Sequence, residues 1–155
     1  MDLAAARQIL EDVGFSDEEI FEIVIEELAI KFAPQLRFDS GCWTCPGPDS
    51  YPMSAQMYFD IKSQNPSQHL SNGDAASITN NTIPIYWKAF QCGRQIRLVY
   101  WIFYGYQYDC DCFSGEHDAD WEHILVVLSE DTTQLAAVTY YQHSGQYTST
   151  SSNKF

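Results

Sequence analysis

Residues 115–128, Gly-Glu-His-Asp-Ala-Asp-Trp-Glu-His-Ile-Leu-Val-Val-Leu, place four carboxylates and two imidazoles at the start of an apolar run. The apolar run is rich in β-branched residues and predicts a buried strand. Successive side chains of a strand point to opposite faces, so Asp120 and Glu122 share one face. Trp121 and His123 share the other face, which we expect to pack in the core. The stretch therefore predicts a strand that begins in an acidic cluster.

This acidic cluster has the ligand types of a metal site. Carboxylate oxygens suit hard divalent cations, and an added imidazole also admits softer ions. His117 lies just before the strand, close enough to reach the face of Asp120 and Glu122. We therefore expect a divalent cation, Ca²⁺ or Mg²⁺ first, with Mn²⁺ or Zn²⁺ as further candidates. The alternative is a network of salt bridges and helix or strand caps without an ion.

The second half of the chain predicts a sheet. Four stretches are rich in β-branched and aromatic residues and are bounded by turn residues: 83–90, 95–106, 121–129 and 134–141. Such strands predict an antiparallel sheet, one layer of a β-sandwich. The segment 54–61 is compatible with a short helix or strand, and the polar residues 62–82 predict a surface loop.

The N-terminal segment predicts a helical hairpin. Residues 2–32 have helical spacing interrupted at Gly14, and Ser16 with Glu19 forms a capping-box pattern. We expect a β-rich α+β protein with a helical hairpin over 1–32 and a β-sandwich domain over 33–155. The acidic face of the second helix predicts a solvated surface, with docking of a partner as the alternative.

Composition and net charge restrict the classes of partner that the protein can bind. The chain has 155 residues, 45% of them hydrophobic, which is enough for one compact domain with its own core. Its formal net charge of −13 argues against nucleic acid and against an anionic bilayer. No segment has the roughly 20 apolar residues of a membrane-spanning helix, and no export signal is visible.

Five cysteines occur as Cys42 with Cys45, Cys92 alone, and Cys110 with Cys112. Disulfides, free thiols and a four-cysteine zinc site are all compatible with this spacing, with disulfides favoured. The loop around Cys42 and Cys45 is rich in Gly and Pro and needs such a link to be ordered.

The motifs resemble two related families. Trp-Ile-Phe-Tyr at 101–104 and His117-x-x-Asp120-Trp121-Glu122 are similar to the core of necrosis- and ethylene-inducing peptide-like proteins, NLPs. Asp-Trp-Glu-His with the later Tyr-Gln-His-Ser-Gly at 141–145 also resembles the Vps62-related domain. NLPs are β-sandwich cytolysins whose motif helps to bind a divalent cation.

The resemblance implies a ligand set and a function. An aspartate eight positions before the motif histidine completes the NLP cation site, so Asp109 joins His117, Asp120 and Glu122 as an expected ligand. It implies a secreted, cation-dependent protein that binds a glycan or glycolipid headgroup at a membrane surface, as a cytolysin or defence toxin. Ala119 stands where the toxin motif has a second histidine, which weakens the inference of toxicity. Both families continue with further strands, so we expect a second chain or segment to complete the sandwich.

An enzyme is the alternative function. A metal-bound water beside Glu122 or His143 could act in a hydrolase or lyase, because a metal ion lowers the pKa of bound water. The sequence contains no nucleophile elbow, phosphate-binding glycine loop or His-Glu-x-x-His helix. Catalysis therefore has weaker support than binding.

Overall fold

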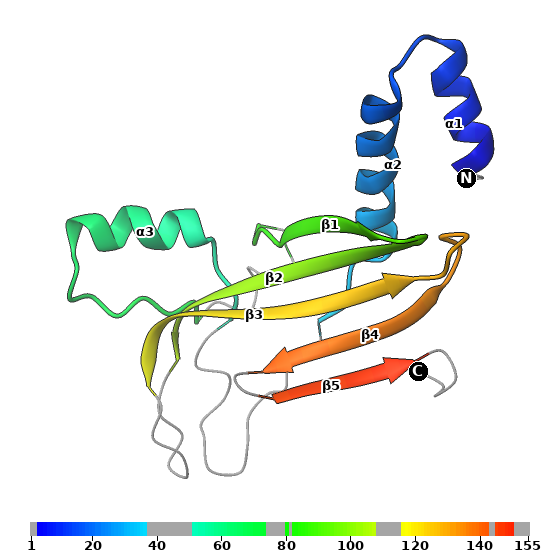
Figure 1. Cartoon of the computed structure of the whole chain (residues 1–155). Coiled ribbons are helices and arrows are strands. Elements are labelled where there is room, and N and C mark those ends of the chain that lie inside the picture. The colour runs from blue at the N-terminus through cyan, green and yellow to red at the C-terminus, as the bar shows by residue number, and fades with distance from the viewer. Residues whose placement is uncertain are drawn as a thin grey trace.

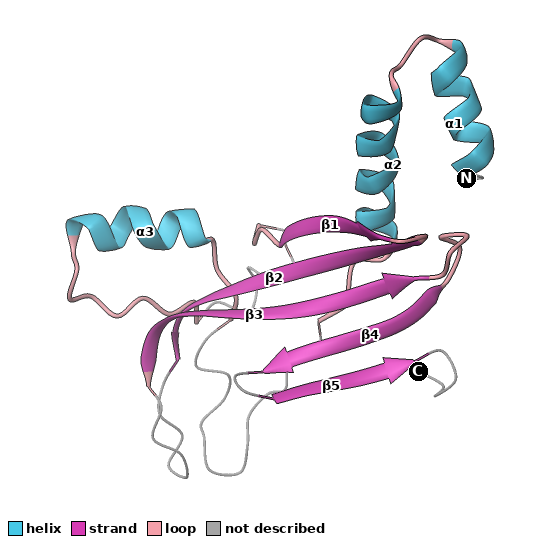
Figure 2. Cartoon of the chain, viewed as in Figure 1, coloured by secondary structure: helices cyan, strands magenta, loops and turns pink. Residues whose placement is uncertain are grey.

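The fold is an antiparallel sheet with three helices, seen in a computed structural model that describes residues 3–36, 51–73, 80, 82–107, 116–142 and 145–150. The helices are α1 (Leu3–Asp12), α2 (Asp17–Lys31) and α3 (Ala55–Gln64). The strands are β1 (Tyr86–Cys92), β2 (Gln95–Gln107), β3 (His117–Leu128), β4 (Leu135–Gln142) and β5 (Gly145–Thr150). The hairpin of α1 and α2 projects from one end of the sheet, and α3 lies at the other end (Figures 1 and 2). The predicted β-rich α+β class is confirmed, with one sheet layer in the described part.

The strands form a meander in chain order, and each is antiparallel to its neighbours. Gly93, at φ 62°, starts the tight turn between β1 and β2, where glycine avoids the strain of a left-handed backbone. Two features were not predicted. The third strand begins at His117 rather than at Trp121, and Gly145–Thr150 adds a fifth strand whose Thr148 hydroxyl lies 3.0 Å from that of Thr139.

One face of the sheet packs against α2. Its buried side chains alternate along β2 and β3, as strand geometry requires, and meet Ile25, Leu28 and Ala29 of the helix. The strand residues are Ile96, Leu98, Tyr100, Ile102, Ile124, Val126 and Leu128. The Tyr100 hydroxyl donates a 2.8 Å hydrogen bond to the Ala29 carbonyl, which joins the last turns of the helix to the centre of the sheet.

The opposite face packs against α3. Phe103 is fully buried there with Met53, Ala55 and Tyr58. The Met53 amide donates to the Phe103 carbonyl at 2.9 Å, so the segment before the helix is bonded directly to β2. Two helices thus cover opposite faces at opposite ends of the sheet.

Local signals explain the helix boundaries. The Ser16 hydroxyl accepts from the Glu19 amide and the Glu19 carboxylate accepts from the Ser16 amide, so the predicted capping box is confirmed. Gly14, at φ 94°, ends α1 and allows the chain to reverse. Ser54 caps α3 with its hydroxyl alone, which accepts from the Met57 amide. None of the described helices has the length and hydrophobicity needed to span a bilayer.

The structure bears on three further predictions: the cysteine pairing, the domain boundary at residue 32 and the element at residues 54–61. Cys92 is an exposed free thiol, whereas Cys42, Cys45, Cys110 and Cys112 lie outside the described residues, so the pairing stays a prediction. The division at residue 32 also stays a prediction, although α2 contributes to the core of the sheet. The segment 54–61 forms a helix, α3, with Ser54 as its N-cap, and this helix extends to Gln64, so the first residues of the predicted loop 62–82 are helical.

Burial raises the pKa of Tyr100 to about 12, which predicts alkaline instability. The unfolded chain releases this proton near its ordinary pKa of about 10, and the folded chain holds it longer. The stabilisation is therefore complete below pH 10 and is lost as pH rises to 12, by at most about 3 kcal/mol. Tyr100→Phe should reduce this loss and, by removing the bond to Ala29, cost about 1 kcal/mol at neutral pH. Urea titrations across this pH range measure both effects, and equal alkaline losses in wild type and variant would contradict the assignment. Tyr140→Phe, at a ring that is 47% exposed, is the matched control.

Candidate functional site

The predicted cation ligands lie at the start of β3, next to the end of β2. His117, Asp120 and Glu122 are all residues of β3 and are all partly buried. Asp109, and His143 of the enzyme hypothesis, lie outside the described residues. The structure therefore places three of the four predicted metal ligands.

Asp120 and Glu122 converge on Tyr104. Both point to the face of the sheet that also carries Tyr104, because Tyr104 pairs with Asp120 and Ile102 pairs with Glu122. The pKa of Tyr104 is raised to about 12, first by burial and then by the negative charges of Glu122 and Asp120. The phenol hydroxyl thus lies within electrostatic reach of both carboxylates.

His117 does not complete this group. It pairs with Gln107, at the far end of the β2–β3 ladder. Among the residues that the structure describes, no three His, Cys, Asp or Glu side chains gather closely enough to hold a metal ion. A complete cation site would need a ligand from elsewhere, such as Asp109.

Asp118 belongs to a different cluster, on the side of α3. Its carboxylate accepts a 2.8 Å hydrogen bond from the Lys62 ammonium, which also donates to the carbonyls of Pro66 and Gln68 at 2.8 and 3.0 Å. Between Asp118 and Asp120, Ala119 has a left-handed backbone at φ 60°. The two aspartates therefore have different partners although only one residue separates them.

Aromatic rings extend the Asp118 cluster. The His69 ring lies 4.4 Å from that of Tyr106, and its Nδ1 is 3.8 Å from the Asp118 carboxylate. The Tyr106 hydroxyl donates to Glu116 at 2.9 Å. Asp118 and Glu116 are both exposed, and each also accepts a hydrogen bond from another element.

The placement of Trp121 also differs from the prediction. Its ring is 42% exposed rather than in the core, with its centre 4.8 Å from that of Phe103 and 5.4 Å from that of Tyr86. Of the described helices, α3 is the one on this face, and it buries Phe103 instead. His123 on the same face stacks on Tyr141 at 4.2 Å. The indole is therefore exposed on the face of the sheet opposite Asp120 and Glu122.

Lys62→Met should loosen the segment between α3 and residue 73. The substitution keeps the length of the side chain but removes the donor that three oxygens share. We expect cleavage near residues 65–70 to become several-fold faster in limited proteolysis, because local opening no longer breaks these bonds. Arg94→Met is the control, since Arg94 makes an exposed ion pair with Glu130. Equal cleavage of the two variants would show that Lys62 does not hold this segment.

Sequence reasoning missed the contribution of α3 to this site. Lys62 and Asp118 are 56 positions apart, and no motif connects them. The signal available was indirect: a lone lysine in the polar stretch 62–82 and an excess of acid at 115–128.

Known structures share this fold. The chain matches a structure described as "Toxin fold as basis for microbial attack and plant defense" with 18% identity and a TM-score of 0.52, over 84% of this chain and 57% of that one. It matches the non-toxic HaNLP3 protein with 14% identity and a TM-score of 0.51, over 82% and 56%. No family model and no curated protein matches the sequence. The fold is therefore similar to that of NLP toxins, and the chain spans a little over half the length of these proteins.

Proposed function

We propose that this protein is a secreted, toxin-like binding protein that holds a divalent cation at the start of β3 and uses it to bind a neutral glycan or glycolipid headgroup. Ca²⁺ or Mg²⁺ is the expected ion, because the donors are mainly carboxylates. The expected ligands are Asp120 and Glu122 with His117 and Asp109.

The convergence of Asp120 and Glu122 on Tyr104 carries the proposal. Burial first, and then the negative charges of Glu122 and Asp120, raise the pKa of Tyr104, so both carboxylates lie near this one phenol. A cation bound between the two carboxylates would be attracted by both charges, so the donor set fits a hard divalent ion. The resemblance of the His117-x-x-Asp120-Trp121-Glu122 motif to the NLP core implies the same location.

The ligand class follows from charge. A bound cation supplies a positive charge that attracts the hydroxyl oxygens of a sugar. The chain carries a formal charge of −13, which favours a neutral ligand over an anionic one. Binding is proposed without cell killing, since the fold also occurs in a protein described as non-toxic.

Isothermal titration with CaCl₂, MgCl₂ and MnCl₂ tests the cation site. Asp120→Asn removes one charged donor with little change in shape and should weaken binding about a hundredfold, or about 2.7 kcal/mol. Asp118→Asn is the matched control, because that carboxylate faces Lys62 and should leave the affinity within about twofold. The site is refuted if the wild type binds none of the ions, or if both variants lose affinity equally.

Vesicle sedimentation tests the ligand. Neutral phosphatidylcholine vesicles are prepared with and without a neutral glycolipid, in calcium or in EDTA. Sedimentation with glycolipid vesicles in calcium alone is the expected result, and dye release from the same vesicles separates lysis from binding. Binding that is indifferent to the glycolipid or to EDTA would contradict the proposal.

A further inference from the structure

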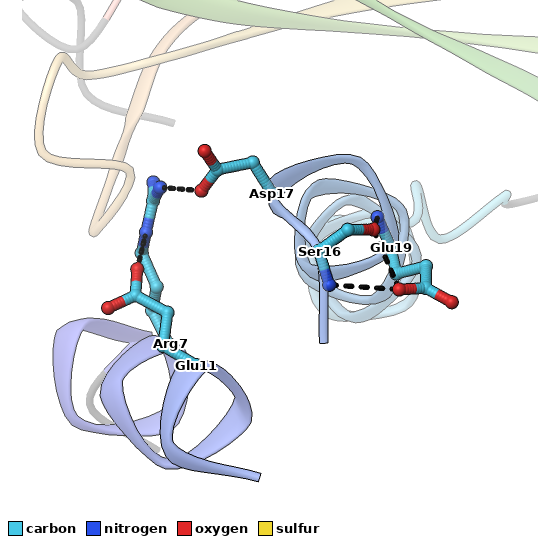
Figure 3. A network of polar contacts seen from close by, with 5 residues as sticks. All are labelled: Arg7, Glu11, Ser16, Asp17 and Glu19. Carbon is cyan, nitrogen blue, oxygen red and sulfur yellow. Dashed lines mark hydrogen bonds and ion pairs between the residues drawn. The ribbon is translucent and has the colours of Figure 1, made fainter. Parts of the chain in front are cut away.

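The helical hairpin is held together by its own contacts. Arg7 of α1 bonds to Glu11 at 2.8 Å and reaches Asp17 at the start of α2 at 2.9 Å (Figure 3). Ile20, near the start of α2, is 1% exposed. The hairpin therefore has a defined shape beyond the edge of the sheet.

Large apolar side chains remain exposed on this hairpin. A helix that only needs solubility would keep polar residues on its outer face. Here six apolar residues are between 37% and 67% exposed: Ile9, Val13, Phe15, Phe21, Ile23 and Ile30. An exposed apolar surface with polar borders is typical of an interaction site.

The outer face of α2 shows the pattern most clearly. Ile23 and Ile30 are two helical turns apart and lie on one stripe. Glu26 and Glu27 lie between them on that stripe, and Glu19 lies one turn before Ile23. The buried side of the helix is occupied by Ile25, Leu28 and Ala29, so this stripe is a second seam, in which two exposed isoleucines are separated by acidic residues.

Charge identifies the kind of partner. The described residues 3–36 contain two basic side chains, Arg7 and Lys31, and Arg7 is bonded to Glu11 and Asp17. They contain eight acidic side chains: Glu11, Asp12, Asp17, Glu18, Glu19, Glu22, Glu26 and Glu27. A second copy of this chain would bring the same acidic surface, and an anionic bilayer would also be repelled.

We propose that the hairpin docks a basic amphipathic helix of a partner protein. Apolar residues of that helix would pack on Ile23 and Ile30, and its lysines or arginines would meet Glu19, Glu26 and Glu27. Such a contact between two helices combines apolar burial with charge complementarity. The inference is independent of the cation site at the other end of the sheet.

A synthetic probe tests the surface on the full chain. The probe is a fluorescent peptide of leucine and lysine with leucines at helical spacing, and its binding is measured by anisotropy. Ile23→Gln with Ile30→Gln should weaken binding about tenfold or more, because the charge is unchanged but the apolar anchors are lost. Both sites are exposed, so the fold should persist, as circular dichroism can verify.

Three controls make the result decisive. Met57→Gln with Ile85→Gln changes two exposed apolar residues elsewhere and should leave binding unchanged. A peptide of the same composition in scrambled order should bind at least about tenfold more weakly. Sedimentation should show a monomer over a wide concentration range. The proposal is overturned if the probe does not bind, if the hairpin variant binds like wild type, if the scrambled peptide binds equally well, or if the seam mediates a dimer.

Discussion

Replacing Phe103 with alanine is expected to lower the free energy of unfolding by about 3–5 kcal/mol, the usual cost of removing a buried aromatic ring. Phe103 is fully buried, and three other rings contact it: Tyr58, Phe59 and Trp121. The substitution would remove the common neighbour of these rings and leave a cavity under α3. Urea denaturation monitored by tryptophan fluorescence measures the loss.

The control for this variant is Phe90→Ala on β1. Its ring is 43% exposed, so the same change in chemistry should cost about 1 kcal/mol. If both substitutions cost the same, α3 is not packed on the sheet as described. The contact between Lys62 of α3 and Asp118 at the start of β3 would then not depend on this packing.

Gly105→Ala is the second substitution with a large expected effect, about 1–3 kcal/mol or more. A Cβ at this position would overlap the Leu70 carbonyl oxygen and the Met53 sulfur and would lie 3.1 Å from the Tyr58 ring. The carbonyl is backbone and cannot rotate away, so the segment at Leu70 must shift or β2 must bend. We expect a lower unfolding midpoint and weaker packing of α3.

Gly73→Ala is the matched control, because a Cβ there would meet nothing within 4 Å. It should be neutral or slightly stabilising, by less than about 1 kcal/mol, since alanine restricts the unfolded chain. A neutral Gly105→Ala would mean that the segment at Leu70 does not lie against β2.

Much of the fold could be predicted from local patterns. The capping box at Ser16, the break at Gly14 and four of the five strands follow from rules that act within a few residues. The fifth strand was harder, because Gly145–Thr150 is polar and short and is stabilised chiefly by pairing with β4. Strand pairing is a contact between segments, which local propensity does not encode.

The sequence predicted which kinds of side chain gather at the start of β3, but it predicted less well which faces they occupy and which residues they contact. Strand alternation correctly placed Asp120 and Glu122 on one face. Alternation failed to predict that Trp121 is exposed. A face of a strand is buried only where another element covers it, and the sequence of β3 does not indicate where α3 packs. Alternation also could not foresee the left-handed Ala119, which gives Asp118 and Asp120 different partners.

The second helix belongs to two parts of the molecule at once. Its residues Ile25, Leu28 and Ala29 are part of the core of the sheet, while Ile23 and Ile30 point outward. A molecule that binds this helix only in its folded form must therefore stabilise the whole sheet, by RT ln(1 + [L]/Kd). Thermodynamic linkage thus makes occupancy of the hairpin visible as a rise in melting temperature, without a label on either partner.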